Sequence, residues 1–139
     1  LCYRATDPQE LIGLQAAGWD PLIDWATARH DAPLRVTQGV IPVDQPDDSL
    51  TRLHAQVVGL DLYGLTALHD LVTIPGSLLL GLAVIQDRVT VEEAFHLSRI
   101  DEDFQITRWG DDEDAQQVAA SRLLAMKQAD HLWRLSRRG

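Results

Sequence analysis

The sequence has a single cysteine, Cys2, among its 139 residues. A disulfide within the chain is therefore impossible, and a metal site built from several thiolates is excluded. The five histidines are scattered, and none forms the two-histidine helical motif with an intervening glutamate that zinc-dependent proteases use. The sequence predicts no metal site and no cofactor, and the lack of disulfides fits a reducing compartment.

Phosphate-binding loops and long apolar runs are also missing. None of the glycines has the spacing of a P-loop or of a dinucleotide-binding fingerprint, so nucleotide binding is not expected. The longest apolar run, Leu78 to Ile85, is much shorter than the roughly 20 residues that cross a bilayer, and no signal-peptide pattern opens the chain. We expect a soluble protein without membrane insertion.

Positive charge is scarce. Twelve lysines and arginines stand against 21 aspartates and glutamates, which gives a formal net charge of −9. Nucleic-acid binding depends mainly on cations that neutralise phosphates, so a nucleic-acid partner is not expected. The acidic balance favours solubility, or a partner with a positive patch. We expect a monomer.

Helix signals fill most of the chain. In the first part, Asp7 with Glu10 predicts a capped helix over residues 8–17, and Asp20 predicts the start of a second helix over residues 21–30. After residue 45 the apolar periodicity and the capping residues predict five further helices, over residues 49–58, 62–74, 77–86, from 91 onward, and from 112 or 114 to about 135.

Only two segments have strand character. The alternation of apolar and polar residues over 34–37 predicts a half-buried strand, which can pair with residues 1–4. The fold class is therefore mainly α, a helical bundle with at most two short strands. We expect one domain over residues 1–139, in which residues 1–45 supply a helix pair and the strands, and residues 46–139 form the helical core.

The helices over 62–74 and 77–86 are apolar on every side, which predicts a hairpin at the centre of the bundle. Gly81 lies within the second of them and would permit a close helix approach.

The most unusual stretch is Leu97 to Gly110. Asp101, Glu102 and Asp103 are adjacent carboxylates between apolar residues, so burial on both sides would hold them at a fixed place. The alternative is that they merely begin a helical turn, where the helix dipole favours negative side chains. Trp109 closes the stretch, and we expect it to be only partly covered and available to a partner.

A catalytic reading of the same region is the main rival. A pair of carboxylates from residues 101–114 would serve as acid and base of a small hydrolase, if a substrate cleft accompanied them. His69 and Asp70 resemble an oriented general base, but no recognisable nucleophile motif accompanies them. We predict no catalytic residues.

Three motifs carry a family resemblance: LCYRA at residues 1–5, WDPLIDWA at 19–26 and DEDFQITRWG at 101–110. They occur in the right order and resemble the ATP synthase assembly factor 2 family over essentially the whole chain. The resemblance implies a two-domain α+β protein, with a β-rich N-terminal domain and a C-terminal orthogonal helical bundle. We expect this chain to be the latter, without its N-terminal domain, which fits a start at Leu1 in place of methionine.

The resemblance also implies a function. Family members are chaperones that hold the unassembled alpha subunit of the catalytic head of F-type ATP synthase until it joins beta, without catalysis or a cofactor. This implies a location in the bacterial cytoplasm, or in the mitochondrial matrix of a eukaryote. A further alternative is a purely structural domain that supports the absent one.

The resemblance also assigns roles to residues. Phe104 stands where the family often has tyrosine, which argues against an essential hydroxyl, and Asp101 and Asp103 reach less far than the glutamates common there. The expected partner-binding residues are Asp101, Glu102, Asp103, Phe104, Gln105 and Trp109, and the expected structural motif residues are Trp19, Asp20, Pro21, Trp25 and Gly110.

Overall fold

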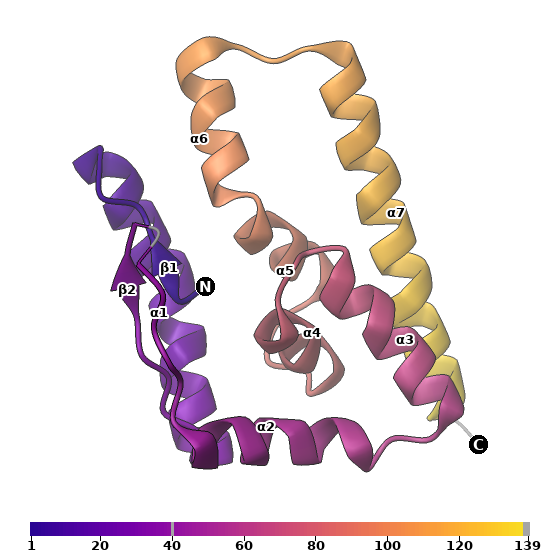
Figure 1. Ribbon diagram of the computed structural model, residues 1–139. Helices are drawn as coiled ribbons and strands as arrows, with labels where there is room; N and C mark the ends of the chain where they lie inside the picture. Colours follow the sequence, from indigo (N-terminus) through magenta and orange to yellow (C-terminus); the bar gives the residue numbers. More distant parts are fainter. Residues whose placement is uncertain (40, 138–139) are drawn as a thin grey trace. The chain divides into compact units, whose positions relative to one another are not determined.

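The computed structural model describes residues 1–39 and 41–137. In this part of the chain, seven helices and one two-stranded sheet follow each other along the sequence (Figure 1). The mainly α fold with two short strands is confirmed. The elements are β1 (Tyr3–Arg4), α1 (Gln9–His30), β2 (Thr37–Gln38), α2 (Asp47–Val58), α3 (Leu62–Thr73), α4 (Leu78–Ile85), α5 (Val91–Ser98), α6 (Ile100–Trp109) and α7 (Glu113–Ser136).

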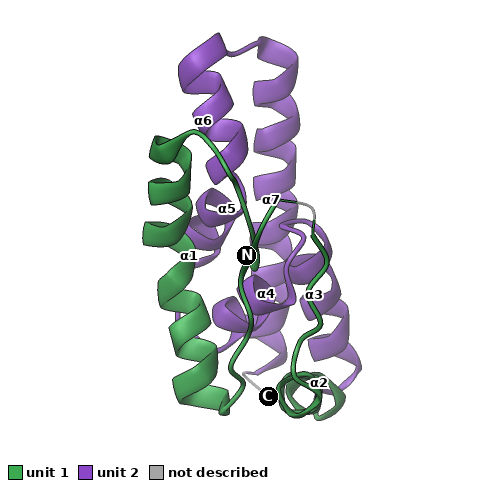
Figure 2. Ribbon diagram, turned by 60° about the vertical axis from the view of Figure 1, so that its left-hand side comes forward, with its two compact units in different colours: residues 1–59 green, residues 60–139 purple. Residues whose placement is uncertain are grey.

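The chain divides into two compact units, residues 1–59 and 60–139 (Figure 2). The sequence predicted a division after residue 45, but α2 belongs to the first unit. Two contacts fasten its beginning there: the Ser49 hydroxyl donates to the carbonyl oxygen of Pro33 at 2.6 Å, and Arg52 lies 3.7 Å from Asp31. That both units form one domain stays a prediction.

The first unit contains one long helix where the sequence predicted two. Helix α1 continues through Pro21, which removes one backbone donor but whose side chain is exposed. Buried Trp19 and Leu22 on either side hold the helix together. The predicted cap at Asp7 is also wrong, because Pro8 occupies the N-cap position and has no side-chain acceptor.

The two strands pair in parallel, with Tyr3 opposite Thr37 and Arg4 opposite Gln38. The predicted pairing is confirmed, but the second strand begins later than expected. The backbone N–H and carbonyl of Arg35 bond instead to the side-chain amide of Gln45, at 2.8 and 3.0 Å. Neither backbone group of Arg35 is therefore available for pairing with β1.

The core of the second unit surrounds α4. Every residue from Leu79 to Ile85 is buried, as expected for a central helix, and α3, α5 and α7 pack against α4. A Cβ at Gly81 would lie 2.7 Å from Cγ2 of Val72 and 3.2 Å from the carbonyl oxygen of Leu71, so the predicted close approach at this glycine is confirmed.

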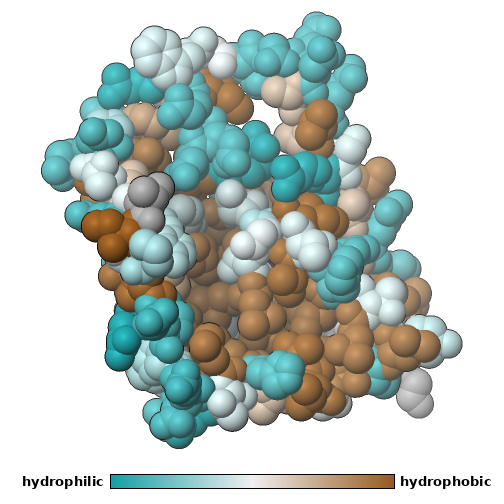
Figure 3. All heavy atoms as spheres, in the orientation of Figure 1, coloured by the Kyte–Doolittle hydropathy of each residue, from teal (hydrophilic) through white to brown (hydrophobic). Residues whose placement is uncertain are grey.

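Helix α3 departs from the prediction of burial on every side. It packs through Gly64, Ala67, Leu68 and Leu71, whereas Leu62 is 74% exposed. Figure 3 shows apolar side chains on the surface over this helix. The physical reason is that α4 and α7 cover one face of α3, and one face is enough to anchor a helix of this length.

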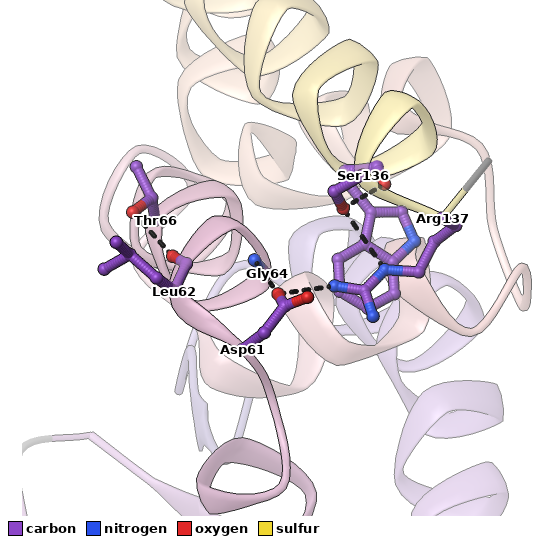
Figure 4. A network of polar contacts seen from close by, with 7 residues as sticks. Asp61, Leu62, Gly64, Thr66, Ser136 and Arg137 are labelled. Atoms are coloured by element: carbon purple, nitrogen blue, oxygen red, sulfur yellow. Dashed lines mark hydrogen bonds and ion pairs between the residues drawn. The ribbon is translucent and has the colours of Figure 1, made fainter. Parts of the chain in front are cut away.

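A polar network joins the beginning of α3 to the end of α7 (Figure 4). The Asp61 carboxylate caps α3 by accepting from the Gly64 N–H at 2.8 Å, and it accepts from the Arg137 guanidinium at 3.0 Å. That guanidinium lies 4.0 Å from the centre of the Trp133 ring. The Gly64 N–H first, and then the charge of Arg137, lower the pKa of Asp61.

Replacing Asp61 by asparagine should lower the urea midpoint of unfolding at pH 7, with a gap to the wild type that depends on pH. Because the folded-state pKa is lowered, the carboxylate stabilises the fold above its unfolded pKa of about 3.9. This contribution is lost as the pH falls through the folded-state pKa. Urea titrations should show a constant gap between pH 5 and 7 that closes below about pH 4; a gap independent of pH would contradict the role of the charge.

Candidate partner-binding site

The site begins at Arg99, where α5 ends and α6 starts without a connecting loop. The Arg99 N–H donates to the carbonyl of His96 at 3.0 Å, and the carbonyl of Arg99 accepts from the Asp103 N–H at 2.8 Å. The Arg99 guanidinium lies 5.5 Å from the centre of the Phe95 ring and 3.6 Å from the Asp103 carboxylate. These contacts fix the start of α6 against α5.

Asp101, Glu102 and Asp103 form the first turn of α6, and all three are exposed. The acidic block therefore does begin a helical turn, where the free N–H groups favour carboxylates. The block also points outward, but the expected burial on both sides is only partly present: Phe104 is buried, Leu97, Ile100 and Ile106 are half-buried, and Trp109 is exposed. That the three acids bind a partner stays a prediction.

Phe104 supplies the anchor of α6. Its ring is buried, and the Arg108 guanidinium lies 5.2 Å from the ring centre. The sequence grouped Phe104 with the partner-binding residues, but its burial gives it a supporting position beneath the acids. A phenylalanine suits this place because it needs no hydrogen-bond partner.

The other end of α6 exposes an aromatic side chain. Trp109 is 82% exposed, and Gln105, one turn before it, is exposed as well. Gly110 ends the helix with φ +90°, a conformation that other residues rarely adopt, and its N–H donates to the carbonyl of Ile106 at 2.8 Å. Asp112 then caps α7 by accepting from the Ala115 N–H at 2.7 Å, which confirms one of the two predicted starts.

A groove of about 540 Å³ lies between α6 and α7. Figure 1 shows the two helices as arms joined by the short connection after Trp109. The sequence placed Val118 on the buried side of α7, but it is 59% exposed and lines this groove, because α3 and α5 pack against α7 farther along. The lining residues are Arg99, Glu102, Gln105, Ile106, Asp112, Asp114, Ala115 and Val118.

The predicted partner-binding residues include Glu102 and Gln105 from the α6 side of this groove, but none from the α7 side. Ala115 and Val118 follow the second group of acids at helical spacing, which was the available signal. A single apolar stripe does not tell whether it faces a core or an open groove.

Four of the expected structural motif residues lie on α1 in the first unit, whereas Gly110 ends α6 in the second unit. The buried Arg4 guanidinium pairs with the Asp20 carboxylate at 2.9 Å and lies 5.4 Å from the centre of the Trp19 ring. The Trp25 ring meets the imidazole of His30 edge-on, with centroids 5.2 Å apart. These contacts involve Trp19, Asp20 and Trp25, whereas Pro21 is exposed within the helix. That the motif residues are structural stays a prediction.

The arrangement does not favour the hydrolase interpretation. Asp101 and Asp111 lie toward opposite ends of α6, which rises roughly 12 Å along its axis between Asp101 and Trp109. Paired carboxylates of glycosidases stand only about 5–9.5 Å apart. His69 and Asp70 contact each other at 3.1 Å but are both exposed on α3. Among residues 1–39 and 41–137, no three histidine, cysteine or acidic side chains come together as a metal site.

None of the helices in the described ranges is sufficiently long and apolar to span a membrane. No protein-family model matches the chain.

Solved structures, however, are closely similar. The crystal structure of Atp12 from Paracoccus denitrificans is 58% identical, with a TM-score of 0.93, over 96% of this chain and 57% of that one. A mutant of the same Paracoccus protein, with lysine in place of an aspartate, is 57% identical with the same TM-score and coverage. A candidate chaperone from Agrobacterium tumefaciens is 36% identical, with a TM-score of 0.89, over 96% of this chain and 50% of that one.

The chain thus spans little more than half the length of the proteins that it matches. Within that span, the fold agrees closely with the Paracoccus structure, and more than half of the residues are identical. This chain belongs to the Atp12 family, the ATP synthase assembly factor 2 family that its sequence motifs resemble.

Proposed function

We propose that this chain is the C-terminal helical domain of an assembly chaperone, and that it binds the unassembled alpha subunit of the F-type ATP synthase catalytic head until that subunit joins beta. Membership of the Atp12 family supports the assembly role. The observation that carries the binding role is the exposed edge of α6, where three acids and Trp109 stand on a helix held by the buried Phe104.

The physical logic is temporary coverage. A subunit that normally pairs with another exposes apolar surface while it is alone, and such surfaces aggregate. An exposed tryptophan offers apolar contact area, and adjacent carboxylates select a partner surface of opposite charge and speed the encounter. Neither step needs catalysis or a cofactor, and the beta subunit would release the client by competing for the same surface.

The setting of this activity belongs to the proposal as well. The chaperone would work as a monomer in the bacterial cytoplasm, or in the mitochondrial matrix of a eukaryote. Its partner would be a protein, with neither nucleic acid nor membrane involved.

Replacing Asp101 by lysine should reduce co-purification of the alpha subunit with this chain about tenfold, because a like charge would then face the client's positive patch. Asp48→Lys is the matched control: Asp48 is exposed in the first turn of α2 and undergoes the same charge change at the same helix position. Both variants should therefore lose a similar, small part of their stability. Equal recovery of the alpha subunit with both variants would remove the acidic block from the interface.

A further inference from the structure

The groove between α6 and α7 is lined by apolar and by acidic side chains. Its apolar part, called the apolar floor below, consists of Ile106 from α6 and of Ala115 and Val118 from α7. Glu102 and Asp114 also line the groove, and their side chains form no hydrogen bond or ion pair with any residue in the described ranges. Within residues 60–137, nothing therefore neutralises these two charges by direct contact.

The charge around the groove is strongly one-sided. Residues 99–114 contain seven aspartates and glutamates but only two arginines. Arg99 is already engaged by Asp103 at 3.6 Å, and the Arg108 guanidinium covers the ring of Phe104 at 5.2 Å. The field at the groove is therefore negative, and a cationic partner would be attracted to it and held there.

The backbone chemistry of the groove selects a helix over an extended segment. An extended chain laid on the apolar floor would need partners for its N–H and carbonyl groups. Both walls are helices, whose backbone groups away from the helix ends are already hydrogen-bonded within α6 and α7, and the strands lie in the other unit. A helix satisfies its backbone internally and buries one apolar face, which is the usual way in which proteins fill a groove between helices.

We infer that the α6–α7 groove binds an amphipathic helix whose apolar face is flanked by lysine or arginine residues. The inference rests on the proposed function for its setting, since the helix would belong to the captured client. It places the contact with the client's helix between α6 and α7, so that α7 takes a direct part in recognition.

The test uses a fluorescein-labelled peptide of about 18 residues, or five helical turns, with leucines on one face and lysines on the other. Its anisotropy should rise with increasing concentration of the chain. A scrambled peptide of the same composition and a leucine–glutamate peptide should bind at least about tenfold more weakly, because the first has no apolar face and the second is repelled. Equal binding of the scrambled peptide would overturn the inference.

Two pairs of variants locate the binding. Ala115→Trp fills the groove and should weaken peptide binding at least about tenfold. Ala120→Trp, which is exposed on the same helix but does not line the groove, should leave it unchanged. Glu102→Lys should likewise weaken binding about tenfold, in contrast to Asp24→Lys, the same reduction of negative charge at an exposed position on α1. Equal peptide affinity for Ala115→Trp and Ala120→Trp would also overturn the inference.

Capture of the alpha subunit is measured separately, so that the two proposals can fail independently. A chain that retains the alpha subunit but does not bind the leucine–lysine peptide refutes the groove and leaves the chaperone role intact. A chain that binds the peptide in the groove but never retains the alpha subunit supports the groove and refutes the proposed client.

Discussion

Trp109→Ala is expected to weaken binding of the alpha subunit about 30-fold, since truncation of a tryptophan at the centre of an interface costs about 2 kcal/mol or more and each ~1.4 kcal/mol is a factor of ten. The side chain is 82% exposed at the end of α6, so a partner can bury most of its area. The same exposure means that the fold does not depend on it. The free energy of unfolding should change by less than about 0.5 kcal/mol.

This separation of binding from stability makes the variant informative. Titration of the alpha subunit gives the affinity, and urea denaturation of the isolated chain gives the stability. Tyr63→Ala is the matched control, because Tyr63 is an aromatic residue on α3 that is 62% exposed and does not belong to the candidate site. Unchanged affinity for Trp109→Ala would show that the client contacts the acids without this aromatic.

The exposure of Trp109 could be predicted from the sequence because its local context is distinctive. A tryptophan directly before Gly110, at the end of a short helix and beside two groups of acids, has few neighbours that could bury it. Asp101, Glu102 and Asp103 were predictable for a similar reason, since three adjacent carboxylates belong at a helix N-terminus facing water. The exposure of Trp109 and that of the three acids both follow from the local sequence.

The errors came from features that depend on tertiary packing. Pro21 reads as the start of a helix, but buried residues on both sides of it hold α1 in one piece. Leu62 and Val118 read as core residues, but the neighbouring helices cover only part of α3 and α7. A periodic apolar face predicts that a helix packs against other elements. It does not predict how much of the length of the helix those elements cover.

The groove is lined by some residues that a local pattern predicts and by others that only tertiary packing brings together. Glu102 and Gln105 were found as members of a motif, whereas Ala115 and Val118 join them only because α7 runs back beside α6. The direction of α7 depends on its contacts with α5 and with α3, which is distant from α7 in the sequence. Such long-range placement cannot be derived from the spacing of residues within one helix.

A substitution in the core of the second unit should change the free energy of unfolding far more than Trp109→Ala does. Gly81→Leu should lower the free energy of unfolding by about 3 kcal/mol or more, at or above the upper end of the usual cost of inserting methylenes into a packed core. The first added carbon would already lie 2.7 Å from Cγ2 of Val72 and 3.2 Å from the carbonyl oxygen of Leu71. Val72 is β-branched and stiff, and the carbonyl belongs to the α3 backbone, so neither can move aside without shifting a helix.

The expected loss is a net value, because leucine is a better helix former than glycine by nearly 1 kcal/mol. Gly13→Leu isolates that gain: Gly13 lies in the interior of α1, and a Cβ there would meet no atom within 4 Å. This control should therefore be stabilised by about 0.5–1 kcal/mol in the same urea titration. Opposite signs for the two variants would establish that contact with α3, and not helix propensity, requires glycine at position 81; a loss of stability in both would refute this explanation.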